Sequence, residues 1–321
     1  MIKKRFLLAL TVLCFVPISL FAQTFKASGF QQFQIGDIQA VVLSDGYIPF
    51  ASVQPILAPV ADADSVSAVL KAQFRSTTSF ELAMNILLLQ KGDRLILFDA
   101  GYGSLVGDYA GKLIHNLALV GITPEQITDV IVTHAHRDHI GGLVDSRGHS
   151  VYSNASIYIS RVEYDLWTKG KPDFSKSKLT DAAAIAGMTT ATRSALKAIE
   201  PQLKKVEDGA TVLDCIQLDI VAGHTDGHLV STIFSKGEKL IAIADVVHSD
   251  AVLFAHPQWG IVFDSNFELG IASRLRVLKE LSQTNDLIFG FHLPYPGIGR
   301  VKEIARNSYT YQPKAFFVPS R

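Results

Sequence analysis

Apolar positions along the chain form short runs rich in Val, Ile and Leu, and these runs alternate with stretches of helical spacing. The short runs are bounded by Gly or Asp, which is typical of buried strands that end in turns. In the first half we predict strands at residues 38–43, 85–90, 94–98 and 129–133, and helices at residues 65–74 and 109–120. In the second half we predict strands at residues 216–221, 230–234, 239–243 and 286–289, and helices at residues 180–199 and 267–281.

Two short connections indicate antiparallel neighbours among these strands. The tripeptides Lys91-Gly92-Asp93 and Lys236-Gly237-Glu238 have the length of hairpin loops. Strands interleaved with helices in both halves predict an α/β fold with two mixed sheets packed face to face and helices outside, an αββα sandwich. Because no internal repeat and no linker is visible, we expect residues 23–321 to form a single domain.

The first 22 residues have the pattern of a signal peptide. A basic segment at residues 3–5 precedes an apolar stretch at residues 6–21, and Ala22 offers a small residue before Gln23. This stretch is shorter than the roughly 20 residues that span a bilayer, which favours cleavage over retention as a membrane anchor. We therefore expect a periplasmic or secreted protein without stable membrane insertion after cleavage.

The composition narrows the class of partner. Hydrophobic residues make up 48% and charged residues 19% of the chain, as in globular proteins, and the formal net charge at pH 7 is zero. Because no stripe of Lys and Arg is visible, we expect no nucleic-acid partner and instead a small, neutral or weakly polar substrate. Loss of the leader would leave Cys215 as the remaining cysteine, which excludes an internal disulfide bond.

Four potential metal ligands directly follow the strand predicted at residues 129–133. They are His134, His136, Asp138 and His139. Two residues apart in an extended stretch, the first two histidines lie on the same side of the backbone, whereas the other two side chains point elsewhere. Three of the ten histidines fall within six positions beside an aspartate, which favours a metal site over structural or surface histidines. Imidazole and carboxylate together are ligands of zinc and similar first-row metals.

This run resembles the His-x-His-x-Asp-His signature of the metallo-β-lactamase superfamily. Asp99 stands in a segment similar to the family's early Asp-x-Gly motif, and His224 begins a segment similar to its third motif. Asp245 and His292 each follow a predicted strand, as the family's last two ligands do. The resemblance covers nearly all of the chain after the leader, and it implies the superfamily's αββα fold.

The resemblance also implies two metal sites that share one carboxylate and a bridging hydroxide. The implied ligands are His134, His136 and His224 for one ion, Asp138, His139 and His292 for the other, and Asp245 for both. Asp138 and Asp245 would act in catalysis, and Asp99 would support the metal loop. The implied cofactors are two divalent ions, with zinc as the first choice and manganese, cobalt or iron as alternatives.

Three further histidines match no ligand position of the family. His228 is expected to support a ligand or to pack in the interior. His248 and His256 are expected in the pocket or at the surface.

The segment at residues 292–301 resembles a stretch of the branch that includes methyl parathion hydrolase. Members of that branch hydrolyse lactones, aryl esters and organophosphate triesters. The carboxylate of Asp245 argues against a true β-lactamase, since β-lactamases generally lack it. Trp167 falls where the branch often places a pocket aromatic, and Trp259 and Phe263 are the other candidates. The alternative is that all three are ordinary packing aromatics.

The function implied by the resemblance is cleavage of an ester-type bond in a small molecule by a metal-activated hydroxide. The bond would belong to a lactone, an aryl ester or an organophosphate triester. A thioesterase of the glyoxalase II kind, a β-lactamase and a non-catalytic metal-binding protein are the alternatives. The leader weighs against the thioesterase, whose substrates are intracellular, and the complete ligand set weighs against a non-catalytic protein. A homodimer is an open alternative to a monomer.

Overall fold

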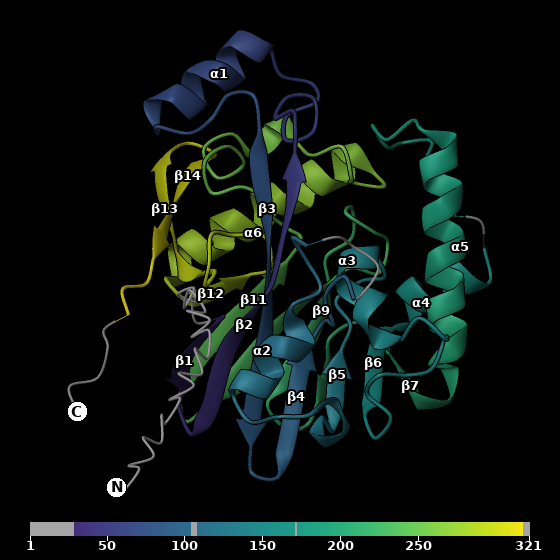
Figure 1. Ribbon diagram of the computed structural model, residues 1–321. Coiled ribbons are helices and arrows are strands. Elements are labelled where there is room, and N and C mark those ends of the chain that lie inside the picture. Colours follow the sequence, from purple (N-terminus) through teal and green to yellow (C-terminus); the bar gives the residue numbers. More distant parts are fainter. Residues whose placement is uncertain (1–28, 104–107, 171, 317–321) are drawn as a thin grey trace, which may run out of the picture.

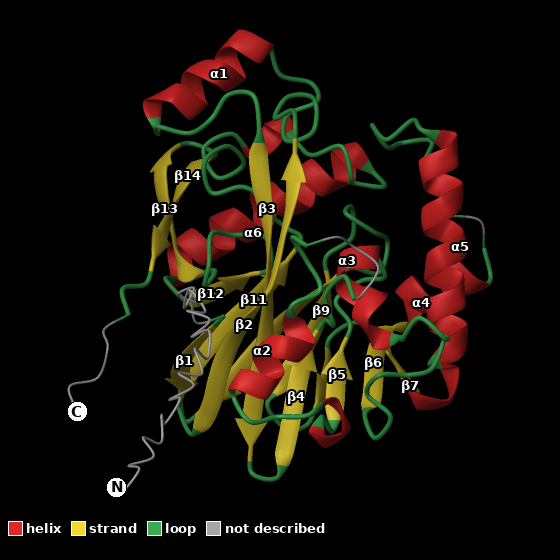
Figure 2. Ribbon diagram, in the orientation of Figure 1, coloured by secondary structure: helices red, strands yellow, loops and turns green. Residues whose placement is uncertain are grey.

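Two sheets packed face to face with helices outside form the body of the molecule (Figures 1 and 2). The structure is a computed structural model and describes residues 29–103, 108–170 and 172–316. The leader predicted at residues 1–22 lies outside these residues. Among the described helices, none is long and apolar enough to cross a membrane.

The first sheet has seven strands in sequential order. Its strands are β1 (Phe30–Ile35), β2 (Ile38–Phe50), β3 (Phe80–Lys91), β4 (Arg94–Phe98), β5 (Asp129–Ile131), β6 (Ser156–Ser160) and β7 (Leu203–Val206). Neighbours from β1 to β4 are antiparallel, and neighbours from β4 to β7 are parallel. The sheet is therefore mixed, as predicted.

The second sheet also has seven strands, again in sequential order. Its strands are β8 (Ala210–Val212), β9 (Ile216–Ile220), β10 (Leu229–Ser235), β11 (Glu238–Ala244), β12 (Leu287–Gly290), β13 (Ile298–Ala305) and β14 (Ser308–Pro313). The pair β11 and β12 is parallel, and the other neighbours are antiparallel.

Six α-helices and four short 3-10 helices surround the sheets within the described residues. The α-helices are α1 (Ala63–Ala72), α2 (Leu113–Leu119), α3 (Arg137–Ile140), α4 (Arg161–Thr168), α5 (Ala182–Ala198) and α6 (Phe267–Thr284). The 3-10 helices are η1 (Pro124–Gln126), η2 (Gly141–Leu143), η3 (Glu200–Gln202) and η4 (Pro257–Trp259). Side chains cap the long helices: Asp181 accepts two backbone N–H groups at the start of α5, and Asn266 accepts one at the start of α6.

The helix predicted at residues 109–120 is wrong at its start. The helix begins only at Leu113, because Gly111 has a φ of +72° and takes the chain out of helical geometry. The orphan N–H of Leu113 donates to Asp45 Oδ1 at 2.8 Å. A carboxylate from β2 thus caps this helix, which the local sequence does not reveal.

The hydrophobic core between the two sheets fixes the strands that precede the predicted metal ligands. Leu87 and Phe98 of the first sheet and Leu240 and Phe289 of the second belong to one buried cluster. Each such side chain contributes about 1.5–3 kcal/mol on burial. Because β4 pairs with β5 in parallel and β11 with β12 in parallel, the carboxyl ends within each pair meet at the same edge of a sheet. The residues that follow these four ends form most of the candidate site, and the loop between β9 and β10 supplies the rest.

Candidate metal centre

Seven side chains from four loops converge where the carboxyl ends of β5, β11 and β12 lie. His134 and His136 follow β5, Asp138 and His139 lie in α3, His224 lies between β9 and β10, Asp245 directly follows β11, and His292 follows β12. All seven were predicted as ligands. The structure brings them together, and six of them are buried, with only Asp138 half-buried.

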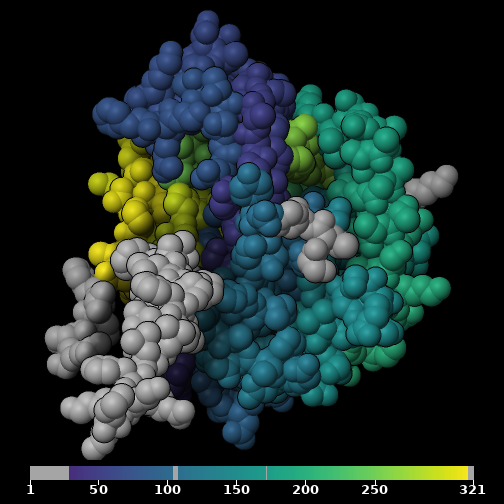
Figure 3. Space-filling view, in the orientation of Figure 1, coloured from purple at the N-terminus to yellow at the C-terminus, as the bar shows by residue number. Residues whose placement is uncertain are grey.

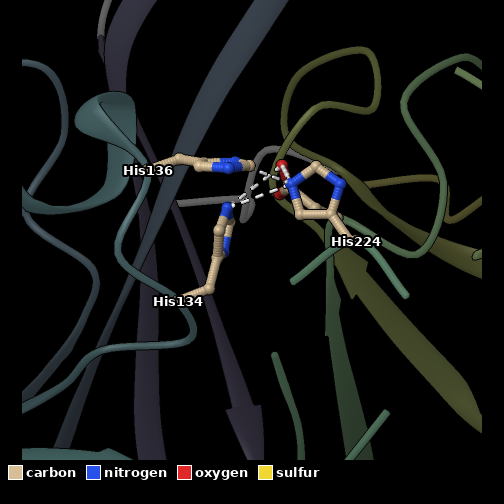
Figure 4. Close-up of side chains that lie close together, drawn as sticks. His134, His136 and His224 are labelled. Atoms are coloured by element: carbon tan, nitrogen blue, oxygen red, sulfur yellow. Dashed lines mark hydrogen bonds and ion pairs between the residues drawn. The ribbon is translucent and has the colours of Figure 1, made fainter. Parts of the chain in front are cut away.

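Three histidines form the first group. His224 Nε2 lies 3.2 Å from His134 Nε2 and 2.9 Å from His136 Nδ1. Figure 4 shows the three rings turned toward one another, two from the loop after β5 and one from the facing loop. Asp245 Oδ2 completes the group at 3.2 Å from His224 Nε2.

Asp138, His139 and His292 form the second group. His292 Nε2 lies 3.3 Å from Asp138 Oδ2, and His139 Nε2 lies 3.7 Å from the same oxygen. Asp245 also reaches this group, with Oδ1 at 3.2 Å from His139 Nε2 and Oδ2 at 3.3 Å from His292 Nε2. One carboxylate therefore contacts both groups.

Hydrogen bonds on the outer side of three rings fix which nitrogen faces inward. The pairs are His139 Nδ1 with Asp99 (2.8 Å), His224 Nδ1 with Asp264 (3.0 Å), and His292 Nδ1 with the carbonyl oxygen of Ala83 (2.7 Å). In a neutral ring that donates from Nδ1, the lone pair is on Nε2. These three Nε2 atoms therefore face the centre as acceptors, and the tautomer is inferred from the outer partners.

A site lined by acceptors on all sides suits a cation. His139 Nε2 and Asp245 Oδ1 are buried and have no hydrogen-bond partner among the described residues. An unpaired buried polar atom is costly, and two lone pairs at about 3 Å repel each other. Imidazole nitrogens and carboxylate oxygens are the ligands that zinc takes in proteins. The residues present thus fit two metal ions that share Asp245.

When no ion is present, the carboxylates of the site favour protonation of its histidines, and a bound cation would take the place of these protons. Burial opposes protonation of His224, but Asp245 and Asp264 outweigh it and raise its pKa to about 9. Burial likewise opposes protonation of His292, and Asp245 with Asp138 raises its pKa to about 9. Because protons and metal ions compete for the same atoms, metal affinity falls as the pH falls.

Two residues of the site did not stand out in the sequence. His248 is buried, its Nε2 lies 3.0 Å from Asp245 Oδ2, and its ring stacks on that of His292. Its position three residues after Asp245 is the only sequence signal. Asp264, which orients His224, also accepts a hydrogen bond from the buried guanidinium of Arg274 at 3.0 Å.

His228 and His256, the other two histidines considered in the sequence analysis, have different surroundings. His228 is buried, and its Nε2 accepts the backbone N–H of Asp245 at 3.1 Å, so it supports the loop of a candidate ligand. His256 stacks on the ring of Trp259, with ring centroids 3.9 Å apart, and belongs to neither group.

A cavity of about 510 Å³ lies over the cluster, which forms its floor. Its apolar walls come from the upper part of β2 and β3, from α5 and from the loop before α6. They include Ile48, Phe50, Leu82, Met188 and Phe263. In Figure 3 the teal-green α5 region forms one side of the molecule, and the purple and blue β2 and α1 regions lie across from it.

The pocket prediction is corrected for both tryptophans. Phe263 lines the cavity, whereas Trp167 and Trp259 are not among its lining residues. Trp167 is only 1% exposed, and its indole N–H donates to Glu163 at 2.7 Å. Because these two residues lie four apart on α4, both face the interior. Trp259 packs against His256 instead.

Comparisons with known proteins agree with this geometry. The family model of the metallo-β-lactamase superfamily matches residues 81–292, which is more than half of the chain. A curated relative, metallo-β-lactamase domain-containing protein 1 of Xenopus laevis, is 40% identical over 59 residues. That match covers 18% of this chain and 22% of the relative's length.

Two solved structures share the whole architecture. One is AidC, a dizinc quorum-quenching lactonase in complex with a product, N-hexanoyl-L-homoserine. It is 36% identical in sequence, and the superposition has a TM-score of 0.88 and covers 91% of this chain and 99% of AidC. The other is AbOPH, a hydrolase in the β-lactamase superfamily; it is 28% identical, with a TM-score of 0.83 over 92% of this chain and 100% of AbOPH.

Proposed function

The chain belongs to the metallo-β-lactamase superfamily of metal-dependent hydrolases, and on that basis we propose that it is a dinuclear hydrolase of small ester-type substrates. The single observation that carries the proposal is the position of Asp245, whose carboxylate contacts both groups of inward-facing acceptors. A shared carboxylate holds two cations at a fixed separation, as two-metal hydrolysis requires.

The proposed ligands are those brought together in the structure: His134, His136 and His224 for one ion, Asp138, His139 and His292 for the other, and Asp245 for both. When bound, the two ions supply Lewis acidity and a hydroxide nucleophile near neutral pH. Asp138, whose side chain is 17% exposed and lines the cavity, would accept a hydrogen bond from that nucleophile and orient it. Asp245 sets the separation of the two groups.

The cavity favours a substrate with an apolar part. Its walls offer Phe50, Leu82, Met188 and Phe263, and its floor offers the carboxylate of Asp138. A lactone with an acyl chain satisfies both regions, because the chain can contact the walls while the ring reaches the floor. The product bound in the dizinc lactonase AidC, which is 36% identical, supports lactones as the first substrate class. Aryl esters and organophosphate triesters are the other proposed classes.

A hydrolysis panel with metal-reconstituted protein lacking residues 1–22 tests the proposal. The panel contains acyl homoserine lactones of several chain lengths, aryl esters, phosphotriesters, thioesters and β-lactams. We expect the highest kcat/KM among the lactones and lower values for aryl esters or phosphotriesters. A preference for thioesters or β-lactams would replace the proposed substrate class, and a metal-loaded protein that hydrolyses nothing would support a non-catalytic role.

Metal content tests the dinuclear part separately. Elemental analysis of reconstituted protein is expected to give about two first-row ions per chain, with zinc as the first choice and manganese, cobalt or iron as alternatives. A stoichiometry that never exceeds one would refute the shared role of Asp245.

Export is the remaining proposal. We propose that residues 1–22 are removed and that the mature protein begins near Gln23, in the periplasm or outside the cell. N-terminal sequencing of protein recovered from the native host decides this. A retained leader with membrane association would favour an anchor.

A further inference from the structure

The three histidines of the first group come from two loops that belong to different sheets. His134 and His136 follow β5 of the first sheet, and His224 lies between β9 and β10 of the second. Their ring nitrogens lie about 3 Å apart, and a shift of either loop by an ångström would break this arrangement. Contacts outside the three rings must therefore fix the position of one loop relative to the other.

Glu163 lies between these two loops, in the first turn of α4. Its Oε1 accepts the backbone N–H of Ala135, the residue between the two histidines, at 2.9 Å. Its Oε2 accepts the hydroxyl of Thr225 at 2.6 Å and the backbone N–H of Gly227 at 3.1 Å. Each carboxylate oxygen thus bonds to one ligand loop, and Trp167 donates a fourth hydrogen bond to Oε1 at 2.7 Å.

The loop of Gly227 packs directly on the start of α4. A Cβ atom at Gly227 would collide with the backbone nitrogen of Glu163 and with Ser160 Oγ, so only glycine allows this approach. Ser160 caps α4 by accepting the N–H of Glu163 at 2.9 Å and donates to the carbonyl oxygen of Gly227 at 2.8 Å. Backbone contact and the carboxylate therefore secure the same loop.

The burial of Glu163 shows how tightly this arrangement is specified. The side chain is 0% exposed, and the four groups that donate to it are all neutral. Burial of a carboxylate without an opposite charge costs several kcal/mol unless hydrogen bonds compensate. An apolar residue here would avoid that cost but would leave four buried donors without an acceptor. Three of these donors belong to the two ligand loops, so the carboxylate serves these loops as well as α4.

We propose that Glu163 is a positioning residue that joins the two ligand loops and thereby sets the distances among His134, His136 and His224. The proposal rests on the ligand assignment proposed above. Glu163 does not reach the cavity and is not a catalytic residue. Its predicted effect is on metal affinity at the three-histidine group and on the order of the two loops.

The variant Glu163→Gln tests the proposal because it keeps the shape and removes one acceptor oxygen. The remaining oxygen can serve only one loop. Thr225 can rotate its hydroxyl to accept from the new amide, but the N–H of Gly227 cannot, so this loop is expected to loosen first. The matched control is Asp45→Asn: Asp45 is also a fully buried carboxylate, and it accepts the backbone N–H groups of Tyr102 and Leu113, neither of which belongs to the two ligand loops.

Amide hydrogen exchange in the metal-free full chain gives a readout that does not depend on metal binding. Exchange at Gly227 is expected to be about tenfold faster in Glu163→Gln, which corresponds to the loss of one hydrogen bond, and exchange at Ala135 is expected to rise less. In Asp45→Asn the exchange at these two amides is expected to stay at the parent rate, while exchange near Leu113 rises. Parent-like exchange of both loops in Glu163→Gln would overturn the proposal.

Zinc affinity gives the second readout. Competition with a chromophoric chelator is expected to show that Glu163→Gln binds one of its two ions about 10- to 100-fold more weakly, and that Asp45→Asn binds both like the parent. If the parent itself binds no zinc, the ligand assignment fails while the exchange experiment still decides the role of Glu163. Parent-like affinity for both ions in Glu163→Gln would count against it.

A second variant covers the case in which Glu163→Gln does not fold. Thr225→Val has the same shape and removes a single hydrogen bond, the 2.6 Å contact to Oε2. We expect several-fold weaker zinc binding and faster exchange at Gly227, in the same direction as for Glu163→Gln. A folded Thr225→Val protein that matches the parent in both measurements would overturn the proposal.

Discussion

His139 forms a hydrogen bond with Asp99 on the side of its ring that faces away from the cluster. Nδ1 of the histidine lies 2.8 Å from Oδ2 of the aspartate, and both side chains are buried. The same carboxylate accepts the backbone N–H of Thr133 at 2.8 Å and its hydroxyl at 2.9 Å. Asp99 therefore joins the end of β4 to the loop after β5. It also turns His139 so that Nε2 faces Asp138 and Asp245.

We expect Asp99→Asn to weaken metal binding by about 10- to 100-fold, because the amide no longer holds the His139 ring as an acceptor facing inward. Excess metal should restore part of the activity, since Asp99 supports a ligand and is not one itself. The measurement is hydrolysis across a metal titration, with circular dichroism to confirm the fold. Unchanged metal affinity would show that the 2.8 Å contact does not orient the ring.

The fold class could be predicted from the sequence because the central strands are apolar in short runs. The predicted strands at residues 38–43 and 85–90 are confirmed but extend further, to Phe50 in β2 and back to Phe80 in β3. Past a register shift at Gly46 the two strands continue to pair with each other, and β2 is no longer fully buried there. Their apolar run ends there, so local pattern could not reveal a length that depends on the partner strand.

The strands that the prediction missed lie mainly at sheet edges. β1 and β14 end their sheets, and residues such as Gln31, Gln34 and Gln312 give them polar faces. An edge strand with one solvated face has few consecutive apolar residues, and its pairing is decided by its neighbour. The helix α4 was missed for a related reason: its inner face includes the polar Glu163.

Site residues could be predicted where the ligands are close together in the sequence. Residues whose contacts join distant parts of the sequence could not be predicted. His134, His136, Asp138 and His139 stood out because they fall within six positions. Glu163 did not, because its hydrogen-bond partners among the ligand loops lie 28 to 64 residues away in the sequence. The contacts that orient a ligand are set by tertiary packing, which spacing does not encode.

Gly187 of α5 lines the cavity, and a Cβ atom there would meet nothing within 4 Å. We expect Gly187→Leu to raise KM for long-chain lactones about tenfold relative to short-chain ones, since filling an apolar pocket discriminates by 1–3 kcal/mol. Ala186→Leu is the matched control, because Ala186 is exposed and does not line the cavity. An unchanged chain-length preference in Gly187→Leu would place the chain elsewhere, for example in the neighbouring cavity that Tyr295 lines.

Asp45 gives a prediction for stability against pH. Burial raises its pKa from 3.8 to about 6, against the opposing effect of the backbone N–H groups of Tyr102 and Leu113. Between these pH values the folded state binds more protons than the unfolded state, so this group lowers the free energy of unfolding as the pH rises from 4 to 6. Asp45→Asn should remove up to about 3 kcal/mol of that dependence.

The measurement is urea unfolding of the parent and Asp45→Asn at several pH values from 4 to 7. The difference between the two free energies of unfolding should change over this interval, with the parent losing stability relative to the variant as the pH rises. A constant difference would mean that Asp45 titrates at its ordinary pKa despite its burial.

Replacement of Asp138 distinguishes an effect on the chemical step from an effect on folding. Its carboxylate contacts His292 at 3.3 Å and lines the cavity, so Asp138→Asn removes the group proposed to orient the nucleophile while keeping its shape. The loss should fall on kcat, by about 10²–10⁴, with KM and the circular dichroism spectrum little changed. Asp165→Asn is the control, because Asp165 pairs with Lys169 on the surface of α4, where an ion pair contributes at most about 1 kcal/mol. A folded Asp138→Asn protein with two ions bound and near-normal kcat would show that another group orients the nucleophile, and His248, 3.0 Å from Asp245, would then be the next residue to replace.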